Sequence, residues 1–226
     1  MLTILFVETA LELVPRGIAG HPSVVRNARR QGKRPEEILL DRSLHHRAML
    51  GLPFAEKRGR PDIIHFCLLE ALGSPLNRMG QLKAYIHTHA GVAVDVARDV
   101  RVPRDCLRFN GLMERLLVDG QVPPAPEKPL MSAHPASLEE IKAGMKPSRT
   151  VALTSHGSRV GLDDLCAKLA AEENPLVLIG AYPHGPMQPE TLSHADEAVS
   201  IYYEALEAWT VTSRLVYEYE KASGVV

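Results

Sequence analysis

Cysteine and aromatic residues are scarce in this chain of 226 residues, and long apolar runs are absent from it. The three cysteines, Cys67, Cys106 and Cys166, lie far apart and form no CxxC pair, so they give no zinc or redox motif. Each lies in an apolar helical pattern, which predicts a small buried side chain. No run of about 18 apolar residues occurs, so we expect no membrane span. The apolar segment Leu2–Val7 lacks a basic leader, and we therefore expect a cytoplasmic protein.

Several common motifs of nucleotide and metal sites are also missing. No GxGxxG follows an expected strand and no GxxxxGK[ST] occurs, so neither a Rossmann dinucleotide site nor a P-loop is supported. His87 and His89 are two residues apart, but no third ligand is evident. The sequence therefore predicts no metal site.

Charge is distributed unevenly along the chain, although the net charge is only −1. Residues 1–120 contain 18 basic and 13 acidic residues, a balance of +5, whereas residues 121–226 contain 8 basic and 14 acidic residues, a balance of −6. This asymmetry indicates an anionic partner for the first half of the chain.

A stretch rich in arginine, residues 101–117, is the most distinctive feature of the first half. Pro103 suits the first position of a helix, because its missing N–H has no partner there in any case. At 100° per residue, three arginines of this helix then fall within about 40° of one line, namely Arg104, Arg108 and Arg115. Two interpretations remain open. The helix is either a surface helix with ion pairs to Asp105 and Glu114, or a row of guanidinium groups that contacts an RNA backbone.

Strands alternate with helices over most of the chain, which predicts an α/β fold with a mostly parallel sheet and helices on both faces. We expect strands over residues 2–7, 38–41, 82–88, 92–96, 150–154, 175–179 and 198–201. We expect helices over residues 22–31, 43–50, 61–72, 103–119, 162–172 and 204–220, with a short one after Ser137. One domain is predicted over residues 1–226, with a proline-rich linker or surface loop at 122–135.

Ligands of such sheets lie at the carboxyl ends of strands. In the last third of the chain these ends fall at Leu153–Ser155, Gly180–Gly185 and Ser200–Leu206. These segments carry glycines and few charges, which suits a ligand held mainly by backbone groups.

Four blocks of sequence together resemble the SPOUT-class methyltransferases that modify N1 of a pseudouridine in small-subunit ribosomal RNA, a family also known for ribosome biogenesis. The blocks are Arg60-Pro61-Asp62-Ile63 with His65, Ser74-Pro75-Leu76-Asn77, Arg101-Val102-Pro103-Arg104 with Arg108-Phe109 and Gly111-Leu112-Met113, and Ile179-Gly180-Ala181 with Gly185. They span roughly residues 60–206, and the first and third are the most specific.

The resemblance implies a C-terminal trefoil knot, within residues 150–226, that holds S-adenosylmethionine, and a homodimer in which RNA contacts both subunits. It implies RNA contacts by Arg60, Arg101, Arg104 and Arg108, and cofactor contacts by Leu153, Gly180, Gly185, Ile201, Tyr202, Tyr203, Glu204, Ala205 and Leu206. The middle of the run Ile201–Leu206 is bulkier than the family pattern suggests. Asp62 is the nearest candidate for a general base, although support of Arg60 is the role we favour. Ribosomal proteins or assembly factors are further possible partners.

Two alternative functions remain open at this point. One is a related methyltransferase that acts on tRNA or on a ribose 2′-hydroxyl. The other is an assembly factor that binds ribosomal RNA without catalysis.

Overall fold

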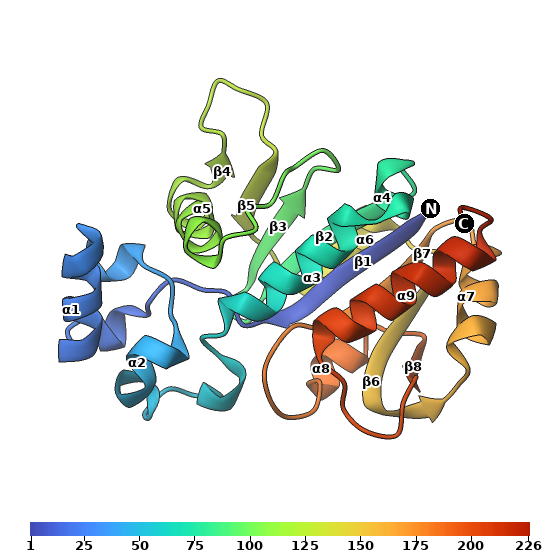
Figure 1. The fold of residues 1–226 in the computed structure, drawn as a ribbon. Helices are drawn as coiled ribbons and strands as arrows, with labels where there is room; N and C mark the ends of the chain where they lie inside the picture. The colour runs from blue at the N-terminus through green and yellow to red at the C-terminus, as the bar shows by residue number, and fades with distance from the viewer.

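A single sheet of eight strands forms the centre of the molecule, and the computed structural model describes residues 1–226 (Figure 1). The strand order is β4-β5-β3-β2-β1-β7-β6-β8. The strands are β1 (Leu2–Thr9), β2 (Leu82–Thr88), β3 (Val92–Val96), β4 (Gln121–Val122), β5 (Met131–Pro135), β6 (Arg149–Arg159), β7 (Pro175–Gly180) and β8 (Glu197–Ser200). Every residue of β1 is buried, as the near-continuous apolar run of this strand predicts.

The sheet is only partly parallel. The pairings among β1, β2, β6, β7 and β8 are all parallel, whereas β3, β4 and β5 extend one side of the sheet with antiparallel pairings. The predicted α/β fold is therefore confirmed, and so is an antiparallel hairpin of the two strands predicted at 82–88 and 92–96, but strands β4 and β5 of the antiparallel extension were not predicted.

Helices cover both faces of the sheet. The helices are α1 (Pro22–Gln31), α2 (Arg42–Met49), α3 (Pro61–Gly73), α4 (Pro75–Arg78), α5 (Cys106–Asp119), α6 (Leu138–Met145), α7 (Leu162–Ala170), α8 (Pro189–Leu192) and α9 (Ala208–Ala222). Alternate residues of β1 face opposite ways, so Ile4 and Phe6 join the main core with α3 and α9, whereas Leu5 and Val7 join a smaller core with α6. Helices α3 and α9 run side by side over one face (Figure 1).

The segment between β1 and α3 forms a separate small lobe at one end of the molecule (Figure 1). This lobe contains α1 and α2 together with three short 3-10 turns, η1 (Arg16–Ile18), η2 (Pro35–Glu37) and η3 (Ala55–Lys57). It has its own core of eight buried residues, which includes Val24, Ile38 and Met49. The strand expected at 38–41 is wrong: only one isolated bridge, between Leu13 and Leu39, forms there.

Three further boundaries differ from the sequence prediction. Residues 131–135 are not part of a linker, because β5 pairs with β3 and shortens the loop to residues 123–130. The arginine-rich helix α5 begins at Cys106 rather than Pro103, and α9 begins at Ala208 rather than Glu204.

Cys67 and Cys166 are buried as expected, but Cys106 is exposed because it lies in the first turn of α5. None of the helices has the length and apolar character needed to cross a membrane.

Candidate active site

A cavity of about 380 Å³ opens at the carboxyl ends of β6, β7 and β8, the edge of the sheet where the sequence predicted a ligand. Its walls are the ends of these strands, the loop that follows β7, the loop that follows β8, and the first turns of α3 and α9. Eight of the nine predicted cofactor residues line it, namely Leu153, Gly180, Gly185, Ile201, Tyr202, Glu204, Ala205 and Leu206.

Tyr203 is the ninth predicted cofactor residue, and it does not line the cavity. Its side chain is 82% exposed and stacks on the guanidinium group of Arg159, with the ring centroid 3.6 Å from Cζ. Of the two tyrosines in the run 201–206, Tyr203 therefore points outward, onto the end of β6, whereas Tyr202 lines the cavity.

The loop of residues 201–206 after β8 carries backbone N–H groups without a partner in the protein. None of these six residues donates its backbone N–H to another group of the protein. Residues 202–205 are exposed, so these N–H groups face solvent beside the cavity and are free to donate to a bound polar ligand. That the ligand is held mainly by backbone contacts stays a prediction.

Two glycines allow the chain to approach the cavity closely. A Cβ atom at Gly180 would lie 2.6 Å from the ring of Tyr182, so only glycine lets this ring lie against the end of β7. Gly185 has a φ of +90°, a conformation that residues with a side chain rarely adopt. The Tyr182 ring and the loop 183–187 both contribute to the cavity wall.

A buried ion pair anchors this loop, and sequence reasoning missed it. The Lys57 Nζ lies 2.5 Å from Glu8 Oε2, donates to the carbonyl oxygen of Pro186 and lies 4.1 Å from the centroid of the Tyr182 ring. The other oxygen of Glu8 accepts from the backbone N–H of Gln188 at 2.7 Å. In the sequence, the charged residue Glu8 directly follows the apolar run Leu2–Val7, which could have marked it as a polar group at a strand end. No sequence pattern indicates Lys57 as its partner.

Arg60 and Asp62 lie beside the cavity at the start of α3, whose first turn contributes Ile63 to the cavity wall. The Arg60 Nε and Nη2 donate to the two oxygens of Asp62 at 2.8 and 2.7 Å. This bidentate pairing raises the pKa of Arg60, and Glu207 adds to the effect. Both Asp62 oxygens are thus occupied by Arg60, which is the arrangement expected of a positioning residue.

The segment before α5 holds two of the other predicted arginines, Arg101 and Arg104, on the surface. His65 of α3 fixes this segment, because its Nε2 lies 2.7 Å from the carbonyl oxygen of Pro103 and its ring stacks on Phe109 at 4.2 Å. His65 therefore has a structural role, because it holds the segment before α5 against α3.

Arg108 is also exposed, in the first turn of α5, where the Asp105 side chain accepts from its backbone N–H and caps the helix. None of Arg101, Arg104 and Arg108 forms an ion pair.

The two acidic residues expected to neutralise this row are both engaged elsewhere. Asp105 is the helix cap, and Glu114 is buried and points into the lobe, where it binds Lys33. Arg115 alone has a neighbour of opposite charge, Asp119, at 3.9 Å. The interpretation of α5 as a surface helix with ion pairs along its arginine row is thus not supported for Arg104 and Arg108.

Comparisons with known proteins identify close relatives over the whole chain. A family model described as EMG1/NEP1 methyltransferase matches residues 4–220. A ribosomal RNA small subunit methyltransferase Nep1 of Staphylothermus marinus is 41% identical over 225 residues, which cover 100% of this chain and 97% of the relative. A Nep1 of Thermococcus kodakarensis is 40% identical, with 100% of both chains covered. The crystal structure of Archaeoglobus fulgidus Nep1 bound to S-adenosylhomocysteine superposes with a TM-score of 0.87, at 40% identity and 98% coverage of each chain.

Proposed function

The chain belongs to the EMG1/NEP1 methyltransferase family, and we propose that it transfers a methyl group from S-adenosylmethionine to N1 of a pseudouridine in small-subunit ribosomal RNA. The observation that carries this proposal is the position of the cavity, which lies directly beside the Arg60–Asp62 pair. A site for a methyl donor and a site for an anionic polymer therefore meet at the start of α3.

The cavity suits S-adenosylmethionine in size and chemistry. Its volume of about 380 Å³ is in the range of sites for small ligands, and the free N–H groups of residues 201–206 offer donors to a nucleoside and an amino acid group. Leu153, Ile179 and Val199 provide apolar contact from the strand ends. When bound, the cofactor would supply a methyl group on a sulfonium sulfur, which leaves as a neutral thioether.

The residues of the chain act by binding and orientation. Attack by N1 requires the base to lie in line with the methyl group at about 3–3.5 Å and to lose its proton, and a base inside an RNA helix cannot reach that position. Arg60, Arg101, Arg104 and Arg108 hold the RNA backbone so that the target base can enter the cavity. Asp62 holds the Arg60 guanidinium in place, and the proton that N1 loses passes to solvent water.

Two features of the family extend the proposal. We propose a trefoil knot in residues 150–226, supported by the strand order, in which β8 lies beside β6 and the chain must return past β6 after β7. We also propose a homodimer, supported by large apolar side chains that are exposed near the site, including Phe66 at 45% and Leu107 at 80%.

Methyl transfer to two matched RNA hairpins tests the reaction. The hairpins differ only in uridine or pseudouridine at the target position of the loop, and the methyl donor is labelled. We expect transfer to the pseudouridine hairpin alone. Equal transfer to both would show that a ribose or another base is the target.

A further inference from the structure

The lobe between β1 and α3 is strongly basic, and the proposed reaction makes no use of most of its charge. Residues 16–60 contain 11 Lys and Arg but only 4 Asp and Glu. Helices α1 and α2 contain no acidic residue at all, and their basic residues, apart from histidine, are all arginine. A helix surface that serves only solubility usually mixes charges of both signs, so this composition indicates contact with an anion.

Ion pairs account for five of these eleven basic residues. Lys33 pairs with Glu114, Arg34 with Glu37, Lys57 with Glu8, Arg58 with Glu12, and Arg60 with Asp62. Three exposed arginines of α1 have no such partner, namely Arg26, Arg29 and Arg30. They share one side of α1, because residues three and four apart are neighbours on a helix, and the opposite side buries Val24 and Ala28. Arg47 is exposed and unpaired on α2.

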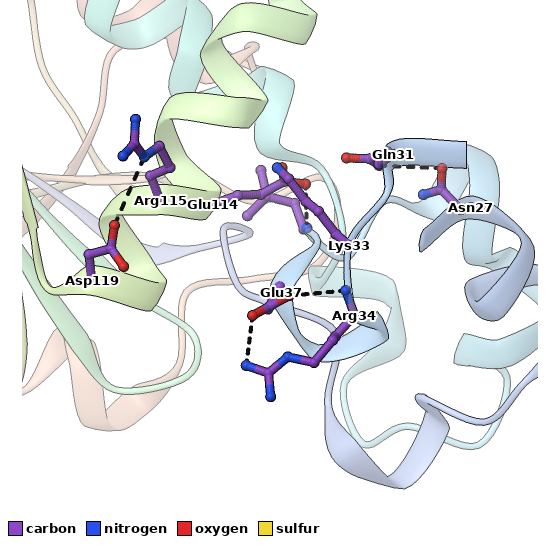
Figure 2. A network of polar contacts seen from close by, with 9 residues as sticks. Asn27, Gln31, Lys33, Arg34, Glu37, Glu114, Arg115 and Asp119 are labelled. Atoms are coloured by element: carbon purple, nitrogen blue, oxygen red, sulfur yellow. Dashed lines mark hydrogen bonds and ion pairs between the residues drawn. The ribbon is translucent and has the colours of Figure 1, made fainter. Parts of the chain in front are cut away.

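Contacts between the lobe and α5 fix the direction in which this surface faces. Figure 2 shows Glu114 reaching from α5 to Lys33, at 2.5 Å, beside the end of α1. The second Glu114 oxygen accepts from the backbone N–H of Leu39 at 2.9 Å. The lobe is therefore attached to the same helix that carries Arg108 at its start, and an RNA bound at α5 lies close to it.

The lobe also adjoins the RNA site at its other end. The backbone N–H of Arg42, at the start of α2, donates to the carbonyl oxygen of Gly59 at 2.8 Å, so the start of α2 lies beside Arg60 and the start of α3. An Asn27–His45 hydrogen bond of 3.0 Å then joins α1 to α2. The lobe thus begins beside Arg60, and its helices α1 and α2 extend away from β6, β7 and β8, whose ends form the cavity (Figure 1).

We propose that Arg26, Arg29 and Arg30 of α1, together with Arg47 of α2, form a second phosphate-binding surface that contacts ribosomal RNA outside the loop that enters the active site. The inference rests on the proposed function, since it takes the RNA to be the substrate. Its consequence is that affinity, but not the choice of the target base, depends on RNA that flanks the target loop.

Salt titration of RNA binding tests this surface. The triple variant R26Q/R29Q/R30Q is compared with the unchanged protein on two RNAs, a minimal hairpin and the same hairpin with its stem extended by flanking sequence. We expect weaker binding of the extended RNA, and a slope of log affinity against log salt that is smaller by about 0.9 for each duplex phosphate that the variant no longer binds. Binding of the minimal hairpin changes much less.

Two further variants make the result specific. K83Q/K146Q/K168Q removes the same charge from exposed lysines outside the lobe, and it should leave the slope for the extended RNA unchanged. R104Q lies in the predicted target-loop contact and should weaken both RNAs. An unchanged slope for R26Q/R29Q/R30Q on the extended RNA, equal weakening on both RNAs, or an equal loss in the lysine variant would each overturn the proposal. Failure of the proposed reaction would appear separately, as absent methyl transfer to the minimal hairpin by the unchanged protein.

Discussion

A single carboxylate fixes the orientation of Arg60, which we propose contacts the RNA. Asp62 offers two oxygens to the Nε and Nη2 of Arg60, so the guanidinium plane is held while its remaining N–H donors stay free. Both side chains are about one third exposed, which limits the worth of the pair through solvent screening. The Arg60–Asp62 pair therefore matters mainly because it fixes the orientation of the guanidinium group, and it adds little to the free energy of unfolding.

Asp62→Asn should weaken RNA binding while the affinity for S-adenosylmethionine stays the same. Asparagine has one acceptor oxygen, so it cannot bind both nitrogens, and we expect a loss of about 1 kcal/mol, roughly fivefold, in kcat/KM for RNA. The measurement is kcat and KM for RNA over a range of pH. A positioning role predicts a higher KM with an unaltered pH profile. A pH profile that flattens, with KM unchanged, would instead identify Asp62 as a general base.

At the scale of single elements, β1 holds the loop after β7, which forms part of the cavity wall, through one side chain. Glu8 lies at the buried end of the strand with a φ of +51°, and its two oxygens reach Lys57 and the backbone N–H of Gln188. Lys57 in turn holds the carbonyl of Pro186. Strand β1, turn η3 and the loop after β7 are thus joined at one point beside the cavity.

Lys57→Met should reduce both stability and cofactor affinity. It leaves the Glu8 carboxylate buried without its cation, and breaking a buried pair costs about 3–5 kcal/mol in the free energy of unfolding. Methionine also cannot donate to the Pro186 carbonyl, which frees the loop, so the Kd for S-adenosylmethionine should rise. The double variant E8Q/K57M removes the unpaired charge and should recover part of the stability but not the affinity. Urea unfolding and calorimetric titration measure the two effects, and an unchanged Kd in both variants would contradict the anchoring role.

Helix α5 illustrates what local sequence signals decide and what they leave open. The sequence prediction begins this helix at Pro103, as an N1 residue, whereas in the structure Asp105 caps it and the helix begins at Cys106. The tertiary hydrogen bond from His65 to the Pro103 carbonyl keeps residues 101–104 extended, and Asp105 becomes the cap. Two of the four predicted RNA contacts, Arg101 and Arg104, therefore lie on a loop rather than on the helix.

At the scale of the whole molecule, apolar periodicity predicted the parallel core of the sheet, because each of its strands is a short apolar run with turn residues after it. The cavity followed from the same pattern, because ligands of such sheets lie at the ends of strands. The polar strand β5 was missed, since residues 131–135 follow a proline-rich stretch and carry little apolar pattern. Glu8 and Lys57 are 49 positions apart, and only the folded chain brings them together.

The polar contact between the basic lobe and α5 is made by Glu114. Its side chain is 5% exposed, binds the Lys33 ammonium and accepts from the backbone N–H of Leu39 (Figure 2). Glu114→Ala leaves this buried N–H without a partner, which costs about 1–3 kcal/mol, and frees the lobe from α5. We expect lower stability in urea and faster hydrogen exchange in residues 16–58. The salt slope for the extended RNA should also fall, as in R26Q/R29Q/R30Q.

Glu37→Gln is the matched control, because it alters an exposed ion pair within the lobe, with Arg34, and leaves the junction with α5 intact. It should change neither hydrogen exchange at the junction nor the salt slope. If Glu114→Ala loosens the lobe but binds the extended RNA with an unchanged slope, the orientation of the lobe is irrelevant to RNA binding. If both the exchange and the slope change together, the junction at Glu114 couples the stability of the lobe to recognition of the flanking RNA.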